Sequence, residues 1–251
     1  MSVSTKSPSL FQQAYARIQG EVLRGSLPPG GRVSEISLAK QLGLGRAPVR
    51  EALRQLHCDG VMQQIPRFGT VVRVPRRRDI IDLYELREAL ETYAVGKAVE
   101  RISPDQIERL EQLLREMGDA ARALKESGEP YLKPEAVQAH LAADMAFHSL
   151  LVSASGNLHI ADTIRKKRVL GRILATYVLR FDLPMLARTY RFHHRVLRAV
   201  KRGDAEAARE ATAEHIRAGM RGMLEHFDRH HEEFGLESDA FPPQVRDALY
   251  D

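Results

Sequence analysis

Cysteine is almost absent from this sequence, and so are the apolar runs that a membrane-spanning or secreted protein needs. Cys58 is the single cysteine, which excludes a disulfide within the chain and suits a reducing compartment. No apolar run approaches the roughly 20 residues of a membrane span, and the Ser- and Thr-rich N-terminus has no apolar signal-peptide core. These absences predict a cytoplasmic protein that does not enter a membrane.

Common catalytic motifs are missing as well. The sequence has no His-Glu-x-x-His metalloprotease pattern, no nucleophile elbow and no glycine-rich loop of the kind that cradles phosphates. The enzyme classes that these motifs mark are therefore not indicated.

Charge is unevenly distributed along the chain. Residues 1–78 hold 13 Lys and Arg against 4 Asp and Glu, a net charge of +9, whereas the remaining residues hold 25 against 29, a net charge of −4. A basic head is typical of a protein that binds a polyanion, because each neutralised phosphate releases counterions. At 251 residues the chain is long enough for two unequal domains.

The segment from Ser37 to Leu56 predicts two short helices joined by a turn at Gly43. The second helix carries an apolar face for packing, made of Val49, Ala52, Leu53 and Leu56. A separate stripe of that helix is cationic and consists of Arg46, Arg50, Arg54 and His57. Such a helix can enter a major groove and donate hydrogen bonds to base edges, although a solvated arginine face is the plain alternative.

A β-hairpin is predicted after this helix. Val61–Ile65 and Thr70–Val74 are strand-like runs on either side of a turn in which Gly69 can take a positive φ. A helix-turn-helix followed by a hairpin is a winged helix, whose tip would present Arg67 to phosphates. Phe68 fits either a groove contact or the core of the small domain.

A dense series of motifs runs in a fixed order through about residues 15–74. It consists of Leu27-Pro28-Pro29-Gly30, Ser34-Glu35, Leu38-Ala39 and Arg46-Ala47-Pro48-Val49-Arg50-Glu51-Ala52-Leu53. In this series the chain resembles the GntR family of transcription regulators. The resemblance implies that Arg46, Arg50 and the wing glycine Gly69 contact operator DNA. The chain departs from the family at Gly45, where Ser or Thr is usual, so a hydroxyl contact to phosphate is lost while the helix still forms.

From Asp79 onward the sequence predicts six helices with recognisable ends. Asp79 caps the first, which runs to about residue 101, and Ser103-Pro104-Asp105-Gln106 carries an N-cap, an N1 proline and a capping-box partner for the second. Gly128, Gly156 and Gly203 mark later boundaries. The predicted fold is mainly α: an N-terminal winged helix-turn-helix with a small β-hairpin wing, and a C-terminal all-α antiparallel bundle of about six helices. The predicted parts are a DNA-binding domain over 1–75, a linker over 76–80, a helical effector-binding, metal-binding and dimerisation domain over 81–234, and a tail over 235–251.

Three histidines and one aspartate of the helical part are expected to converge. Asp144 and His148 lie four residues apart on one side of a helix, His193 shares an apolar stripe, and His215 lies beside apolar positions of the last helix. One such histidine alone is more often a hydrogen-bonded core residue. Together they predict a divalent-metal site with open positions, zinc first and nickel or manganese as alternatives. His140, one turn before Asp144, is interpreted as structural or solvated.

This arrangement resembles the FCD effector domain of the FadR-type subgroup of GntR regulators. The resemblance covers about residues 83–216, including Leu86-Arg87, Glu91, Gly156-Asn157 and Gly203-Asp204. It implies that Asp144, His148, His193 and His215 are the metal ligands and that a small carboxylate effector ligates the ion. The ion could instead only clamp three helices together.

Arg87 is a candidate effector-binding residue, because its guanidinium lies at the apolar edge of a helix and would pair with a carboxylate. Glu91 could equally neutralise it in a structural ion pair. Arg172 is a weaker candidate of the same kind.

These features predict a homodimeric transcription regulator that binds a near-palindromic operator on double-stranded DNA. Repression that the effector relieves is the commoner mode in the resembling family, so a repressor is expected. Two alternatives stay open: a metal-dependent hydrolase that uses the same four ligands, and an architectural protein that binds DNA without sequence preference.

Overall fold

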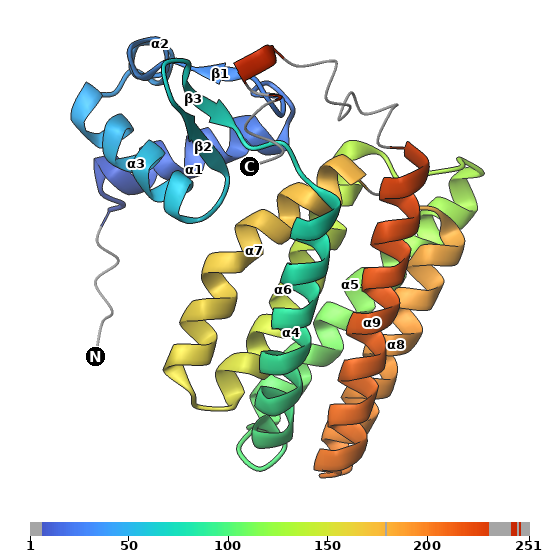
Figure 1. Cartoon of the computed structure of the whole chain (residues 1–251). Helices are drawn as coiled ribbons and strands as arrows, with labels where there is room; N and C mark the ends of the chain where they lie inside the picture. The colour runs from blue at the N-terminus through green and yellow to red at the C-terminus, as the bar shows by residue number, and fades with distance from the viewer. Residues whose placement is uncertain (1–6, 179, 231–241, 245, 247–251) are drawn as a thin grey trace. The chain divides into compact units, whose positions relative to one another are not determined.

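The computed structural model describes residues 7–178, 180–230, 242–244 and 246 (Figure 1). The chain divides into two compact units between Arg76 and Arg77. We call the described residues up to Arg76 the head and Arg77–His230 the bundle. The head is a winged helix with a small antiparallel sheet and the bundle is all helical, so the predicted fold class is confirmed. The tail expected over 235–251 lies mainly outside the described residues.

The head contains three helices and three short strands. Its helices are α1 (Leu10–Leu23), α2 (Glu35–Leu42) and α3 (Arg46–Cys58), and its strands are β1 (Arg32–Val33), β2 (Met62–Ile65) and β3 (Gly69–Val72). The antiparallel sheet has the order β1-β3-β2, and β2 and β3 form the wing. Strand β1 was not predicted from the sequence, because two residues are too few to show a period of two.

The helix-turn-helix forms where the sequence predicted it. Gly43 ends α2 in a left-handed conformation (φ 64°), and Gly45 is the N-cap of α3 without a side-chain hydrogen bond. Helix α1 packs against α3 and closes the core from the other side. The fully buried core residues of the head include Ile18, Val49, Leu56 and Val72.

Six helices form the bundle. They are α4 (Arg77–Ala98), α5 (Pro104–Ser127), α6 (Pro134–Ala154), α7 (Leu158–Val178), α8 (Leu183–Lys201) and α9 (Ala205–His230). The predicted capping box at the start of α5 is present between Ser103 and Gln106. The expected linker over 76–80 is mostly helical, since α4 begins at Arg77, whose guanidinium pairs with Asp228 of α9 at 3.0 Å.

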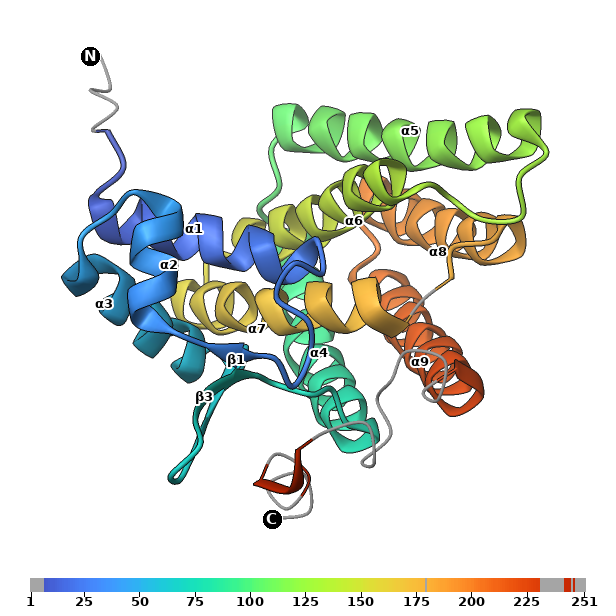
Figure 2. The same ribbon diagram turned by 90° about the horizontal axis from the view of Figure 1, so that it is seen from above.

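The helices of the bundle pack around two apolar clusters. Helix α5 lies over α6 and α8 (Figure 2), and their shared core includes Leu113, Met117, Phe147 and Val200. A second cluster joins α4 to α6, α8 and α9 through Ile80, Leu141, Leu186 and Met223. Two buried histidines, His148 and His193, pack against Phe147 of the first cluster.

Candidate metal centre and DNA-reading surface

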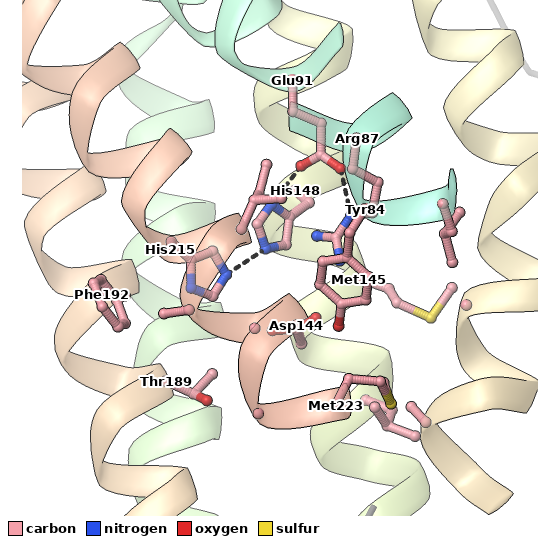
Figure 3. Close-up of a pocket in the computed structure, with 18 of the residues that line it drawn as sticks. Tyr84, Arg87, Glu91, Asp144, Met145, His148, Thr189, Phe192, His215 and Met223 are labelled. Carbon is pink, nitrogen blue, oxygen red and sulfur yellow. Dashed lines mark hydrogen bonds and ion pairs between the residues drawn. The ribbon is translucent and has the colours of Figure 1, made fainter. Parts of the chain in front are cut away.

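Three helices bring the four expected ligands together. Helix α6 provides Asp144 and His148, α8 provides His193, and α9 provides His215. One ligand atom of each residue lies within 4.8 Å of the others, and all three histidines are buried. Figure 3 shows His148, His215 and Asp144 turned toward a common space.

The distances inside this cluster suit a metal ion. Nε2 of His148 lies 3.1 Å from Nε2 of His215, and Nε2 of His193 lies 3.2 Å from Oδ1 of Asp144. Two nitrogens that each bind one ion at about 2.0–2.1 Å must lie about this far apart. His193 is fully buried, and with its proton on Nδ1 the Nε2 atom turns a lone pair toward Asp144 without making a hydrogen bond. A buried nitrogen without a partner is costly, and a metal ion would satisfy it.

Hydrogen bonds outside the cluster orient two of the rings. Nδ1 of His148 lies 2.7 Å from Oε2 of Glu91, and Nδ1 of His193 lies 2.8 Å from the carbonyl oxygen of Thr189. Both partners are acceptors, so each Nδ1 donates its proton outward and each Nε2 turns a lone pair toward the centre. Carboxylates and carbonyls play this part around many histidine metal sites.

The electrostatics favour ionised carboxylates at the cluster and a neutral His215. Burial alone would raise the pKa of the Glu91 carboxyl, but the Arg87 guanidinium and the His148 imidazole override it and hold that pKa well below its usual range. Burial likewise opposes ionisation of Asp144, yet the neighbouring imidazoles, His193 foremost, lower its pKa. Burial lowers the pKa of His215 and keeps this ring neutral. Ionised carboxylates and neutral imidazoles are the forms that coordinate a metal.

A cavity of about 150 Å³ opens beside the cluster. Its polar lining includes Tyr84, Arg87, Glu91, Asp144, His148 and His215, with Lys167 and Arg188 from α7 and α8, and most of its remaining wall is apolar. In Figure 3 the Tyr84 hydroxyl points toward Asp144. The arrangement can hold a small polar ligand next to an ion.

Arg87 fits both interpretations that the sequence left open. Its Nε donates to Oε1 of Glu91 at 2.8 Å, and the same residue lines the cavity. Burial by itself disfavours the charged guanidinium, but Glu91 overrides that effect and raises the pKa of Arg87. The side chain of Arg172 lies outside what the structure describes.

Some residues of this site were not predicted from the sequence, and for His140 both a structural and a solvated environment were left open. Thr189, Lys167 and Arg188 were not expected, and His140 proves to be a buried ring beside Phe181 rather than a solvated one. Thr189 precedes His193 by one helical turn, a spacing that could have indicated a carbonyl acceptor. No comparable signal distinguishes Arg188 from the many other arginines of α8.

The head places the expected DNA-contacting residues on its surface. Arg46 and Arg50 begin α3 with about two thirds of each side chain exposed, and both donate to Glu35 at the start of α2. The hydrogen bond from Arg50, and after it the one from Arg46, lower the pKa of Glu35 to about 2. Arg54 is also exposed.

The wing tip has an unusual backbone. Arg67 adopts a positive φ of 64° and Gly69 one of 112°. The Phe68 ring packs against the guanidinium of Arg32 at 5.5 Å and is half-buried, so it has a packing partner within the head.

Comparisons with known proteins agree with these two units. The family described as "Bacterial regulatory proteins, gntR family" matches residues 10–72, and the FCD domain matches residues 82–218. The chain belongs to the GntR family. Its FCD domain contains all four residues of the histidine–aspartate cluster.

Relatives of this GntR-family chain match along most of its length. The uncharacterised HTH-type transcriptional regulator YdhC of Bacillus subtilis is 28% identical over 212 residues, covering 84% of this chain and 89% of that protein. The "Probable D-xylose utilization operon transcriptional repressor" of Paenarthrobacter nicotinovorans is 29% identical over 200 residues, covering 79% and 81%. The solved structure of E. coli McbR/YncC has a TM-score of 0.71 at 25% identity and covers 88% of this chain and 100% of its own.

The GntR-family chain is therefore a DNA-binding transcription regulator. Its family consists of regulatory proteins that act on operator DNA through the winged helix. Among the helices that the structure describes, none has the length and apolar character needed to cross a membrane.

Proposed function

We propose that this GntR regulator is a homodimeric repressor whose operator binding is controlled by a small carboxylate at a metal ion in the bundle. The observation that carries the proposal is the buried cluster of Asp144, His148, His193 and His215 beside a cavity, in a chain whose other unit reads DNA. The proposed division is a DNA-binding domain over 1–75, a linker over 76–80, an effector-binding, metal-binding and dimerisation domain over 81–234, and a tail over 235–251.

The donor set supports a divalent ion such as zinc, with nickel or manganese as alternatives. Three imidazoles are borderline ligands and the carboxylate is a hard one, and around a five- or six-coordinate ion they leave a position for an outside oxygen. When bound, the ion would supply a positive charge that fixes a carboxylate. Arg87 would orient that carboxylate from the cavity wall while Glu91 holds the His148 ring in place.

DNA recognition is assigned to α3 and the wing. Arg46, Arg50 and Arg54 would face the major groove, and Arg67 with the backbone at Gly69 would contact phosphates. Two heads related by a two-fold axis would match the two halves of a near-palindrome. Repression rather than activation is supported by the relative in Paenarthrobacter nicotinovorans, which is named a probable transcriptional repressor.

Control of operator binding requires that the effector binds the DNA-competent and DNA-incompetent arrangements with different affinity. A ligand with equal affinity for both would not shift the equilibrium between them. Binding of the effector to the metal-loaded bundle is proposed to disfavour the DNA-competent arrangement.

The proposal is tested with an operator selected from a random duplex library by the full-length protein. We expect tight binding by the zinc-loaded protein and release on addition of a carboxylate that raises its melting temperature. Arg50→Ala should weaken binding to the selected operator by roughly one to two orders of magnitude and reduce discrimination against random duplex. Equal affinity of the wild type for the selected operator and random DNA would favour an architectural protein.

A role in hydrolysis is the rival function for the same ligands. We propose that the site binds an effector without turnover, and the family of the chain supports this. Ester, amide or phosphate hydrolysis that disappears in a His148→Ala/His193→Ala double variant would contradict this part of the proposal.

A further inference from the structure

With a divalent ion bound at the cluster, the cavity beside it would hold more positive charge than a single carboxylate can balance. Its described lining contains three cations, Arg87, Lys167 and Arg188, against two carboxylates, Glu91 and Asp144. A divalent ion would add two charges, so one bound carboxylate would leave a net positive charge along the cavity wall.

Two of these cations have no carboxylate partner among the described residues. Arg87 is paired with Glu91 at 2.8 Å, and Asp144 lies beside His193, whereas Lys167 and Arg188 make no ion pair within the part of the chain that the structure describes. Both nevertheless line the cavity, Lys167 as a half-buried residue and Arg188 as an exposed one.

A glycine of α9 gives Arg188 its place at the cavity wall. A Cβ atom at Gly222 would lie 3.1 Å from Nη2 of Arg188, which is tighter than almost all real contacts. Gly222 lines the same cavity, so the guanidinium lies over the bare backbone of α9.

We propose that the effector carries a second anionic group, which Arg188 binds with Lys167 while the first group binds at the metal next to Arg87. The inference rests on the proposed function, because it assumes a carboxylate effector at the metal. It narrows the effector class from carboxylates in general to small dicarboxylates and related dianions.

The test compares carboxylates of equal carbon number on the zinc-loaded full chain. Calorimetry and thermal shift are measured with propionate and malonate, butyrate and succinate, and valerate and glutarate, and zinc content is checked after each titration. We expect at least one dicarboxylate to bind about tenfold or more tightly than its partner, because a guanidinium–carboxylate pair in a partly closed site is strong. Arg188→Met and Lys167→Met should each reduce the ratio of dicarboxylate to monocarboxylate affinity, without changing the zinc content or the affinity for the monocarboxylate.

Arg191→Met is the matched control, since Arg191 is an exposed cation of the same helix that does not line the cavity. The Arg191→Met variant should keep the full ratio of dicarboxylate to monocarboxylate affinity. If mono- and dicarboxylates bind equally well, the second anionic group is refuted and the proposed function stands. If none of the six probes binds the zinc-loaded protein, the carboxylate effector itself is refuted. A ratio that survives both cavity variants would overturn the assignment to Arg188 and Lys167.

An independent observation in the head carries a second inference. Oε1 and Oε2 of Glu35 accept two hydrogen bonds from Arg50, from Nη2 at 3.0 Å and from Nε at 2.9 Å, and Oε1 also accepts one from Nε of Arg46 at 3.1 Å. One carboxylate on α2 thus fixes the two arginines that begin α3. In this geometry one edge of the Arg50 guanidinium is occupied, while the edge formed by its two Nη atoms keeps N–H groups that can donate to guanine O6 and N7.

We infer that Glu35 is a positioning residue for sequence readout and not a base contact itself. Glu35→Gln should lower the ratio of operator to random-duplex affinity by about fivefold or more, while affinity for random duplex stays equal or rises because a negative charge is lost near phosphates. Glu51→Gln removes the same charge from an exposed site of α3 and should leave the ratio unchanged.

A double-mutant cycle separates positioning from a merely structural role. If Glu35 acts through Arg50, Glu35→Gln should have little further effect on the ratio in an Arg50→Ala background. Additive effects, or a Glu35→Gln variant that binds the operator more tightly than wild type with unchanged discrimination, would overturn the inference.

Discussion

Arg67 occupies a backbone conformation that disfavours its own side chain. It follows Pro66 in the wing turn, which is closed by a 3.1 Å hydrogen bond from the Phe68 amide to the Ile65 carbonyl, and its φ of 64° is of the kind that glycine adopts without strain. For other residues this conformation costs roughly 1–2 kcal/mol. A strained arginine at an exposed tip suggests that its guanidinium is retained for binding.

Comparison of two substitutions at this position separates strain from function. Arg67→Gly and Arg67→Ala should weaken DNA binding to a similar extent and lower its dependence on salt, because both remove one cation. In urea denaturation the glycine variant should be more stable than the alanine variant by about 1 kcal/mol, since only alanine keeps the strain. Equal stability of the two would show that the turn carries no strain.

Neighbouring histidines on α8 offer a test of the metal site at the same scale. His193 is fully buried in the cluster, whereas His194 is exposed and stacks on Tyr190 at 6.4 Å between ring centroids. His193→Gln should lose most of the zinc that metal analysis finds in wild type, and His194→Gln should lose none. Circular dichroism would check that both variants fold, and loss of zinc from the His194 variant would contradict the proposed ligand set.

Helix starts in the bundle differ in how their first amide groups are satisfied. At α5, Ser103 and Gln106 exchange hydrogen bonds in a capping box, with distances of 2.9 and 3.2 Å. At α6, the N-cap is Lys133 and no side chain caps the helix. The two helices pack together in the same core, so they can be compared within one protein.

Ser103→Ala should lower the free energy of unfolding by about 1 kcal/mol, because it removes the acceptor for the Gln106 amide. Lys133→Ala should change it by only a few tenths of a kcal/mol, since no cap is lost. Thermal or urea unfolding of the metal-free protein would measure both. A larger loss from Lys133→Ala than from Ser103→Ala would contradict this account of the helix ends.

Local signals explain which elements the sequence could predict. Caps and breakers such as Ser103, Gly128 and Gly203 act on their own neighbours, so the six helices of the bundle were predicted close to their observed bounds. The four clustered ligands were also predicted, because helical spacing and family resemblance agreed. The pairing of Glu35 with Arg50, and the position of Arg188 over Gly222, were not predicted, because they join residues on different helices whose packing no local pattern encodes.

At the scale of the whole molecule, a bound ion would stabilise one unit only. The four candidate ligands all belong to the bundle and come from α6, α8 and α9, and none of them lies in the head. Binding to the folded state raises stability by about 2.7 kcal/mol when the free ion is at 100 times its dissociation constant.

Scanning calorimetry of the full chain, with zinc and with a chelator, should therefore show that the unfolding transition of the bundle shifts while that of the head does not. The bundle transition should fall in temperature when zinc is removed, and the head transition should stay. In a His148→Ala variant the chelator should have no effect on either. A zinc-dependent shift of the head transition in wild type would contradict the assignment of the site to the bundle alone.

The spread of the ligands over α6, α8 and α9 also bears on how the protein is made. His215 follows Asp144 by 71 residues, so at about 5–20 residues per second the ribosome adds the last ligand roughly 4–14 s after the first. A nascent chain that ends before α9 can offer an ion at most three of the four ligands. Metal loading would therefore distinguish a chain that has completed its bundle from one that stalled during translation.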